Sequence, residues 1–301
     1  MSPMRVAAAP ISWGVCEVPG WGVQLERDVV LGQMVELNFA ATELGPAGFL
    51  PTDANALQAV LAQSGLALAG AFVAPVLHDP AQRLAALAEV DAAATLLAEV
   101  GLDAPVVLAC ATGTGGYETA GALDDAGWSL LAEGVSEVVA RCAYHGVGCV
   151  LHPHVGTMIE TAADVDRIMA ATEIALCLDT GHLLAAGADP LAVLGTHVAR
   201  VRHVHLKDVD ASLAAQVREG KLAYAEAVSA GMYVPLGTGD VPISDVLATL
   251  EHADYRDWVV VEQDLRLDAA DGAAERAREG AAHARTFLTA HEVSRGREVA
   301  S

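Results

Sequence analysis

The chain of 301 residues is 53% hydrophobic and carries a formal net charge of -22. This apolar content can fill one large domain or two small ones, and the negative charge disfavours nucleic acid or an anionic membrane as a partner. The longest apolar run, residues 66–77, contains Gly70 and Pro75, and we expect neither a membrane span nor a signal peptide. The five cysteines show no C-x-x-C spacing, which predicts reduced thiols and a cytoplasmic location.

Short apolar segments alternate along the chain with longer segments in which apolar residues recur at helical spacing. The segments predicted to form strands are Arg5–Ala9, Ala40–Leu44, Ala67–Val73, Val106–Cys110, Gly148–His154, Ala175–Asp179, Val201–Leu206 and Trp258–Glu262. The predicted helices include Asp28–Leu37, Asn55–Ser64, Gln82–Val100, Ala126–His145, Thr161–Ala171 and a final helix from about Ala269 to His291. Three helices are expected to begin next to a capping residue: Asp53, Thr161 and Ser244.

Eight strand–helix units without a linker predict an α/β fold, namely a single-domain (β/α)8 TIM barrel over residues 1–292, with a frayed tail at residues 293–301. A doubly wound open sheet is the alternative. Such a sheet usually carries a glycine-rich phosphate turn after an early strand. The segment PISWGVCEVPGWG, which follows the first predicted strand, matches neither G-x-G-x-x-G nor a P-loop, so the barrel is the expected fold.

Ionisable side chains cluster where five of the predicted strands end: Glu43, His152, His154, Asp179, His203, His205, Lys207 and Glu262. In a barrel, the carboxyl ends of the strands form one face, and active sites lie there. Side chains alternate along a strand, so His152 and His154 are predicted to share a face. Buried imidazoles and carboxylates are costly unless they are paired, and a divalent cation is a simple partner for a mixed nitrogen and oxygen set.

Several of these residues also have a purely structural explanation. Asp179 can be a helix cap, and His203 can be a buried structural histidine, because one strand rarely supplies two ligands. His182 can meet substrate or solvent, and Glu43 can be a rim carboxylate held by an arginine. Glu262 follows the apolar segment WVVV, where an unpaired carboxylate would be costly, so a ligand role is expected there.

Six segments carry a family signature: APISWG (9–14), ATELGPAGFLP (41–51), HPHVGTMIET (152–161), LDTGHLLAAGADP (178–190), RHVHLKDV (202–209) and VVEQD (260–264). Over essentially the whole chain they resemble the xylose isomerase-like barrels, also called sugar phosphate isomerases/epimerases. DTGH and HVHLKD are typical of that superfamily. HPHxGT resembles its inosose dehydratase branch most closely.

The resemblance implies a divalent metal site. Asp179, His205 and Glu262 match three of the four positions that hold the metal in the superfamily. The fourth, after strand five, is a glutamate in the epimerases and His152 in this chain; His152 is therefore the expected ligand, with His154 as second choice. Mn²⁺ or Co²⁺ is the expected cofactor, with Mg²⁺, Fe²⁺ and Zn²⁺ as alternatives.

The implied activity is that of a carbon–oxygen lyase, a dehydratase that removes water from 2-keto-myo-inositol. A proton next to the ketone is abstracted and the β-hydroxyl leaves, with Glu262 as the expected base and His154 or Lys207 as the acid. The expected substrate contacts are His182, Glu43 and Trp13, and Gly181 is expected to permit a tight turn.

Three other functions stay open. The first is an isomerase or epimerase of an inosose or keto sugar on the same metal site. The second is a metal-free binding protein on a barrel scaffold, which the intact ligand positions disfavour. The third is an endonuclease, which the net charge of -22 disfavours. The expected partner is a small polyol or keto sugar, and a homo-oligomer stays open.

Overall fold

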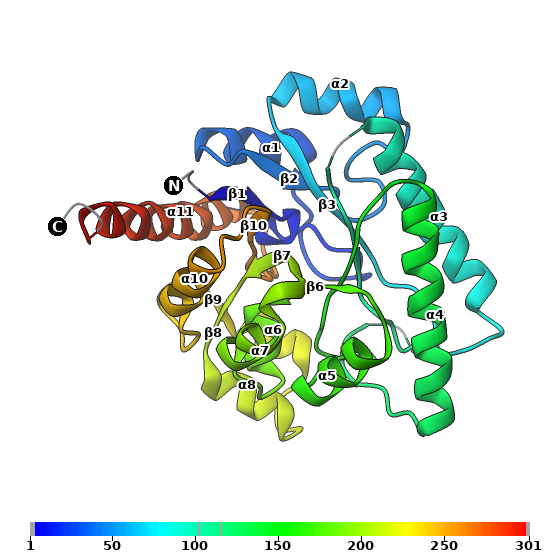
Figure 1. Ribbon diagram of the computed structural model, residues 1–301. Coiled ribbons are helices and arrows are strands. Elements are labelled where there is room, and N and C mark those ends of the chain that lie inside the picture. The colour runs from blue at the N-terminus through cyan, green and yellow to red at the C-terminus, as the bar shows by residue number, and fades with distance from the viewer. Residues whose placement is uncertain (1–3, 102, 115, 299–301) are drawn as a thin grey trace.

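Eight parallel strands close into a barrel, and helices surround it (Figure 1). This computed structural model describes residues 4–101, 103–114 and 116–298. The barrel strands are β1 (Arg5–Ala8), β2 (Ala41–Glu43), β3 (Ala67–Val73), β4 (Val106–Leu108), β5 (Cys149–Leu151), β6 (Ala175–Asp179), β7 (Val201–Leu206) and β10 (Trp258–Val261). Around the barrel their order is β1-β10-β7-β6-β5-β4-β3-β2, which closes the sheet. The predicted single (β/α)8 barrel is confirmed, and the open sheet is excluded.

The predicted helices are present, with ends that differ by a few residues. The helices are α1 (Arg27–Glu36), α2 (Ala54–Ser64), α3 (Arg83–Val100), α4 (Asp125–Tyr144), α5 (Ala162–Ala171), α6 (Thr180–Ala185), α7 (Pro190–His197), α8 (Ala211–Arg218), α9 (Tyr224–Ser229), α10 (Ile243–His252) and α11 (Ala273–Glu298). Asp53 and Thr161 cap α2 and α5 as predicted, each accepting a hydrogen bond from a backbone N–H of the first turn. Ser244 does not cap α10, because this helix already begins at Ile243.

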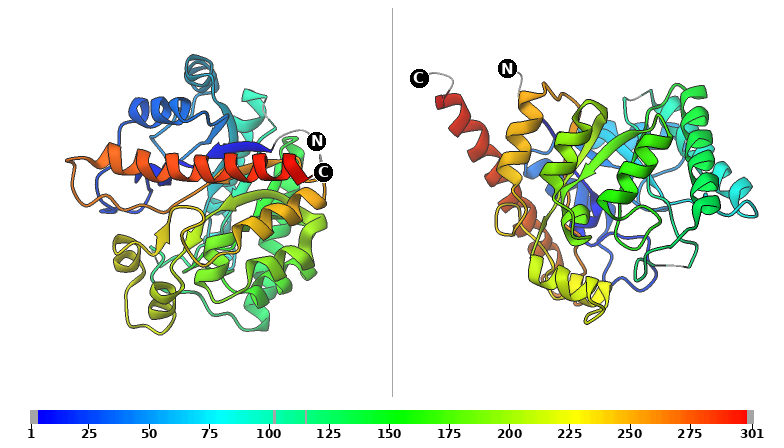
Figure 2. Two further views of the ribbon diagram at one scale, coloured as in Figure 1. Left: turned by 90° about the vertical axis from the view of Figure 1, so that its left-hand side faces the viewer. Right: turned by 60° about the horizontal axis from the view of Figure 1, so that its bottom comes forward.

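The last helix extends further than the sequence predicted. α11 is helical to Glu298, beyond His291, so 293–298 continue the helix where we expected a frayed tail to begin. Residues 299–301 of that tail lie outside the described residues. α11 packs beside α1 and the 3₁₀ turn Pro10–Trp13, on the outside of β1 (Figure 2).

The connection between β7 and α10 is a small substructure that the sequence analysis did not separate. It contains a two-stranded antiparallel sheet, β8 (Asp208–Val209) with β9 (Tyr233–Val234), and the helices α8 and α9. The buried carboxylate of Asp208 accepts hydrogen bonds from the backbone N–H groups of Gly237, Gly239 and Val241, at 2.8–3.0 Å. These bonds hold the connection against the carboxyl end of the barrel, where it brings Tyr224 and Tyr233 close to the strand ends.

No helix among the described residues is long and apolar enough to cross a membrane. All five cysteines are free thiols, and Cys110, Cys142 and Cys177 are buried in the protein interior. At these buried positions a thiol packs as a small apolar side chain.

Candidate active site

Four buried side chains meet at the carboxyl end of the barrel. The ligand atoms of His152, Asp179, His205 and Glu262 all lie within 4.8 Å of one another. His152 Nε2 is 3.3 Å from Asp179 Oδ2 and 3.1 Å from His205 Nδ1. Glu262 Oε2 is 2.5 Å from the same His205 nitrogen. The structure thus brings together all four residues for which the sequence predicted a metal-ligand role.

These four side chains come from four neighbouring strands. Asp179 is the last residue of β6 and His205 lies within β7, while His152 and Glu262 directly follow β5 and β10. His154, which the sequence placed on the same strand as His152, lies in the loop beyond the end of β5. Because parallel strands of a barrel end at one face, residues more than a hundred positions apart in the chain converge there.

Asp179 serves as a helix cap and as a member of the cluster. Its Oδ1 accepts a hydrogen bond from the His182 backbone N–H at 2.7 Å, which caps α6, while Oδ2 faces His152. Burial acts to raise the pKa of Asp179, but the charges of Lys207 and the nearby histidines outweigh it and hold this pKa well below its usual value. The cap and the ligand interpretations of Asp179 are therefore compatible, because each uses a different oxygen.

The donor set fits a divalent cation. Glu262 Oε2 is buried, and although His205 Nδ1 lies 2.5 Å away, this pair does not have the geometry of a hydrogen bond. A buried carboxylate oxygen without a hydrogen bond is costly, and a cation beside it removes that cost. Two imidazole nitrogens and two carboxylate oxygens suit Mn²⁺, Co²⁺, Fe²⁺ or Zn²⁺.

Glu43 orients His205 through the ring nitrogen that does not face the cluster. Its Oε1 lies 2.8 Å from His203 Nε2 and 3.0 Å from His205 Nε2, and both nitrogens can donate to it. Because Nε2 of His205 faces Glu43, Nδ1 is the nitrogen that faces the cluster. Glu43 is held by histidines rather than by an arginine, and His203 takes the structural role that one of our two interpretations gave it.

Lys207 lies in a closed compartment next to the cluster. Its ammonium is 2.8 Å from Asp264 Oδ1, 2.8 Å from His182 Nε2 and 3.4 Å from Asp179 Oδ2, and the side chain is fully buried. Burial acts to lower the pKa of Lys207, but Asp179 and Asp264 outweigh it and raise this pKa well above its usual value. Lys207 therefore stays charged and balances the carboxylates around it.

Gly181 makes room for the stem of Lys207. A Cβ atom at this glycine would lie 2.5–2.7 Å from three carbons of the lysine side chain. We expected Gly181 to permit a tight turn, but it lies within helix α6 and its backbone is not in the left-handed region. The glycine is thus required by close packing rather than by a turn.

A ring of hydrogen bonds links Lys207 to two tyrosines that the sequence analysis did not select. His182 Nδ1 is 3.1 Å from Tyr233 OH, which is 3.2 Å from Tyr224 OH, which in turn donates to Asp264 Oδ2 at 3.0 Å. Asp264 closes the ring through its other oxygen on Lys207. Burial raises the pKa of Asp264 to about 6. The signal for Asp264 was its place in VVEQD, two residues after Glu262.

His154 lies between two rings at the cavity wall. Its ring centroid is 4.2 Å from that of Tyr117 and 3.7 Å from that of His182. Nδ1 of His154 is 2.7 Å from the Val155 carbonyl oxygen and must carry a proton to bond it. Burial, with the charges of His152 and Lys207, holds the pKa of His154 well below its usual value, so the ring is neutral and Nε2 is an acceptor.

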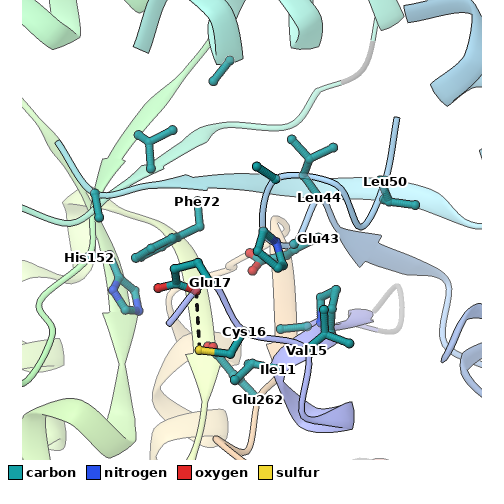
Figure 3. Close-up of a pocket in the computed structure, with 18 of the residues that line it drawn as sticks. Ile11, Val15, Cys16, Glu17, Glu43, Leu44, Leu50, Phe72, His152 and Glu262 are labelled. Carbon is teal, nitrogen blue, oxygen red and sulfur yellow. Dashed lines mark hydrogen bonds between the residues drawn. The ribbon is translucent and has the colours of Figure 1, made fainter. Parts of the chain in front are cut away.

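A cavity of about 780 Å³ opens onto this cluster (Figure 3). Its polar end is lined by His152, His154, His205, Glu262, Asp264, Glu43, Tyr117, Tyr224 and Glu17. Tyr117 OH donates to Glu17 Oε1 at 2.6 Å, which joins the loop after β4 to the loop after β1 across this end of the cavity. A polyol would find both donors and acceptors there.

The three expected substrate contacts either lie outside the cavity or already bond to other side chains. Trp13 is wrong: its side chain is fully buried and donates to Gln33 Oε1 at 2.8 Å, while Trp21 lines the cavity instead. The 3₁₀ turn Pro10–Trp13 directs Trp13 into the core. His182 is 1% exposed, so it meets no solvent, and neither His182 nor Lys207 is among the described residues that line the cavity. Glu43 lines it, but one of its oxygens is occupied by two imidazoles.

Comparison with known proteins points in one direction. The model of the family described as xylose isomerase-like TIM barrel matches residues 32–287. An inosose dehydratase of Geobacillus kaustophilus is 33% identical over 274 residues, which span 87% of this chain and 88% of the relative. The rhizopine catabolism protein MocC of Rhizobium meliloti is 32% identical over 271 residues, 86% of this chain and 81% of that protein.

Solved structures show the same fold at lower sequence identity. The probable 3-DHS dehydratase AsbF of Bacillus anthracis superposes with a TM-score of 0.71 at 14% identity, covering 95% of this chain and 99% of AsbF. The 3-keto-D-glucoside 4-epimerase YcjR of E. coli superposes with a TM-score of 0.67 at 19% identity, covering 94% of this chain and 99% of YcjR. At these identities the likeness concerns the fold alone.

Proposed function

This chain belongs to the xylose isomerase-like TIM barrel family, and on that premise we propose that it is a metal-dependent dehydratase of a keto-inositol such as 2-keto-myo-inositol. The observation that carries the proposal is the convergence of His152, Asp179, His205 and Glu262 next to a cavity that three of them, all but Asp179, line. The similarity to inosose dehydratases over most of both chains supports the substrate class. We propose a cytoplasmic location and a small polyol partner on the same grounds.

In this proposal the cation, Mn²⁺ or Co²⁺, would be held by His152, Asp179, His205 and Glu262. When bound, it supplies Lewis-acid stabilisation of the negative charge that develops when a proton is removed next to a ketone. His205 is kept in the required orientation by Glu43, and Asp179 by the N-terminus of α6.

Glu262 is the proposed base. Burial acts to raise its pKa, but His205 and Lys207 outweigh it and lower this pKa, so the carboxylate is ionised and able to accept a proton. Its Oε2 faces the cluster, and Oε1 lies 3.7 Å from the Lys207 ammonium. We propose a one-base route in which Glu262 takes the proton next to the ketone, the electron pair of that carbon–hydrogen bond forms a carbon–carbon double bond, and the carbon–oxygen bond of the β-hydroxyl breaks. The proton taken by Glu262 leaves with the departing hydroxyl as water.

His154 and Lys207 fill other roles in this route. His154 is neutral with its free lone pair on Nε2, which suits accepting a hydrogen bond from a substrate hydroxyl better than donating a proton. Lys207 is enclosed by Asp264, His182 and Asp179, which suits holding the carboxylates in place better than delivering a proton to the cavity.

The competing function is an isomerase or epimerase on the same metal site, and several solved structures of this fold carry epimerase names. The strand-five position, a glutamate in the epimerases that the sequence resembles, is His152 here. Of the two carboxylates that would act as bases in an epimerase, this chain therefore keeps only Glu262. One base favours an elimination over an epimerisation, which uses two.

The experiment is a substrate panel. The metal-free protein is loaded with Mn²⁺ or Co²⁺ and incubated with several keto-inositols and 3-keto sugars, and the products are read by mass spectrometry. We expect one keto-inositol to lose the mass of a single water, only in the metal-loaded protein. Products of unchanged mass would support the isomerase instead, and turnover without metal would contradict the proposed site.

A further inference from the structure

The cavity has a second region that the proposed reaction does not use. Away from the metal-ligand cluster, it is bounded by side chains that we call the apolar wing: Val15, Leu44, Leu50, Phe72 and Leu96. In the view of Figure 3, Phe72 lies between His152 and the loop that carries Leu44 and Leu50. The Phe72 ring stands edge-on to His152, with centroids 5.8 Å apart, and so marks the border between the two regions.

The wing is a built part of the barrel. Leu50, Val15 and Leu96 are only 3%, 5% and 6% exposed, because they pack into the main hydrophobic core with their remaining surface at the cavity. They come from the loop after β2, the loop after β1 and helix α3, three elements that are fixed by packing on the barrel. Packed side chains of this kind keep their positions and define a stable binding surface.

The cavity is larger than the proposed ring substrate. It measures about 780 Å³, within the range of roughly 300–1,000 Å³ that holds ligands of drug size. A keto-inositol has about twelve non-hydrogen atoms. If each of them took up ~30 Å³, the volume of a water molecule in the liquid, the molecule would still fill less than half of this cavity. Once the ring lies on the metal-ligand cluster, the wing is left for another group.

The chemistry of the wing selects an apolar group. Among the described residues that line the cavity, the polar side chains outside its polar end are Cys16, Thr52 and Glu89, and the last two are exposed to solvent. A second sugar ring in the wing would lose hydrogen bonds to water and find few partners, which disfavours it. An alkyl or aryl group would gain from leaving water.

We infer that the natural substrate is a keto-inositol that carries an apolar substituent, an ether-linked alkyl or aryl group, on the side of the ring turned away from the metal-ligand cluster. This inference rests on the proposed function for the placement of the ring. The substituent occupies the apolar wing and contributes binding free energy without contacting the reacting atoms, so it determines specificity.

Binding of non-reacting analogues tests the inference separately from turnover. O-methyl, O-propyl and O-phenyl ethers of myo-inositol, with the ether at each distinct ring position, are titrated into the Mn²⁺-loaded protein by calorimetry. They have no ketone and cannot undergo the elimination. For at least one ring position, we expect each added methylene to tighten binding about three- to fourfold, the factor that corresponds to burying one CH₂ group.

Two variants on helix α3 locate the effect. Ala93 lines the cavity and Ala98 is exposed and does not. In Ala93→Phe the preference for the longer ether should be lost, whereas the matched Ala98→Phe variant should retain it. The inference is overturned if unsubstituted inositol binds as tightly as every ether, or if Ala93→Phe keeps the preference. Ethers that bind as expected, together with ketones that lose no water, would support the inference and contradict the proposed dehydratase instead.

Discussion

At the scale of single residues, we propose two functions for Glu262, as a metal ligand and as the base. Replacing it by glutamine keeps one oxygen as a ligand but removes the ability to accept a proton at neutral pH. We expect Glu262→Gln to lower kcat by roughly two to four orders of magnitude, the range of general-base effects. Metal content and binding of an unreactive inositol should survive in part. The exposed Glu219→Gln variant, with the same chemical change, should keep its rate.

A Glu262→Gln variant with most of its rate would contradict this account, because another group would then be the base. Steady-state kinetics and metal analysis of the same two preparations decide the question. A parallel loss of metal and rate would instead mean that Glu262 acts mainly as a ligand.

The two histidines that follow β5 are predicted to have different roles, metal binding for His152 and substrate binding for His154. His152 faces Asp179 and His205, whereas Nδ1 of His154 is bonded to a backbone carbonyl and its ring is stacked between Tyr117 and His182. Metal content should therefore fall mainly in His152→Ala. His154→Ala should keep its metal and raise KM more than it lowers kcat. Retained metal in the first variant and loss in the second would exchange the two roles, and a collapse of kcat in His154→Ala with metal intact would make His154 the acid.

At the scale of secondary-structure elements, helix α6 packs against Lys207, the residue after β7, and this contact depends on the glycine at position 181. A Cβ at Gly181 would collide with the Lys207 stem, whereas a Cβ at Gly195, within helix α7, meets no atom within 4 Å. Gly181→Ala should lower the free energy of unfolding by about 1–3 kcal/mol, as overpacking does, and weaken metal binding. Gly195→Ala should raise it by about 0.5–1 kcal/mol, because alanine favours the helix. Urea unfolding measures both, and equal effects would refute the packing argument.

The sequence was informative about side chains at the carboxyl ends of the barrel strands. Asp179, His205 and Glu262 could be placed together because parallel strands end at one face of a barrel, whatever the distance along the chain. The same rule found His152 and Glu43. It could not show that Glu43 holds His205 in place as well as lining the cavity, since that depends on which ring nitrogen each carboxylate meets.

Loops and insertions carried the information that the sequence did not reveal. Trp13 was expected to contact substrate, but the direction of its side chain is set by a single 3₁₀ turn that the sequence does not reveal. Tyr224, Tyr233 and Asp264 meet only through the β7–α10 connection, whose two-residue strands are too short to leave a periodic pattern.

At the scale of the whole molecule, the proposed metal links four strands, β5, β6, β7 and β10, that the unfolded chain does not hold together. A cation that binds the folded state stabilises it by about 2.7 kcal/mol at a hundred times its dissociation constant. We expect Mn²⁺ to raise Tm by several degrees over protein kept in a chelator, as read by calorimetry. His152→Ala should lose this difference. An unchanged Tm in both would argue against a resident cation.

A reaction in D₂O tests whether this barrel removes water from a keto-inositol by way of one base. The Mn²⁺-loaded protein is incubated with 2-keto-myo-inositol or its ethers, and substrate and product are followed by mass spectrometry over time. We expect a product that is lighter by one water and recovered substrate that gains little deuterium, because the abstracted proton leaves with the hydroxyl. Deuterium that accumulates in recovered substrate, with no loss of water at any time, would contradict this expectation and make the protein an isomerase or epimerase.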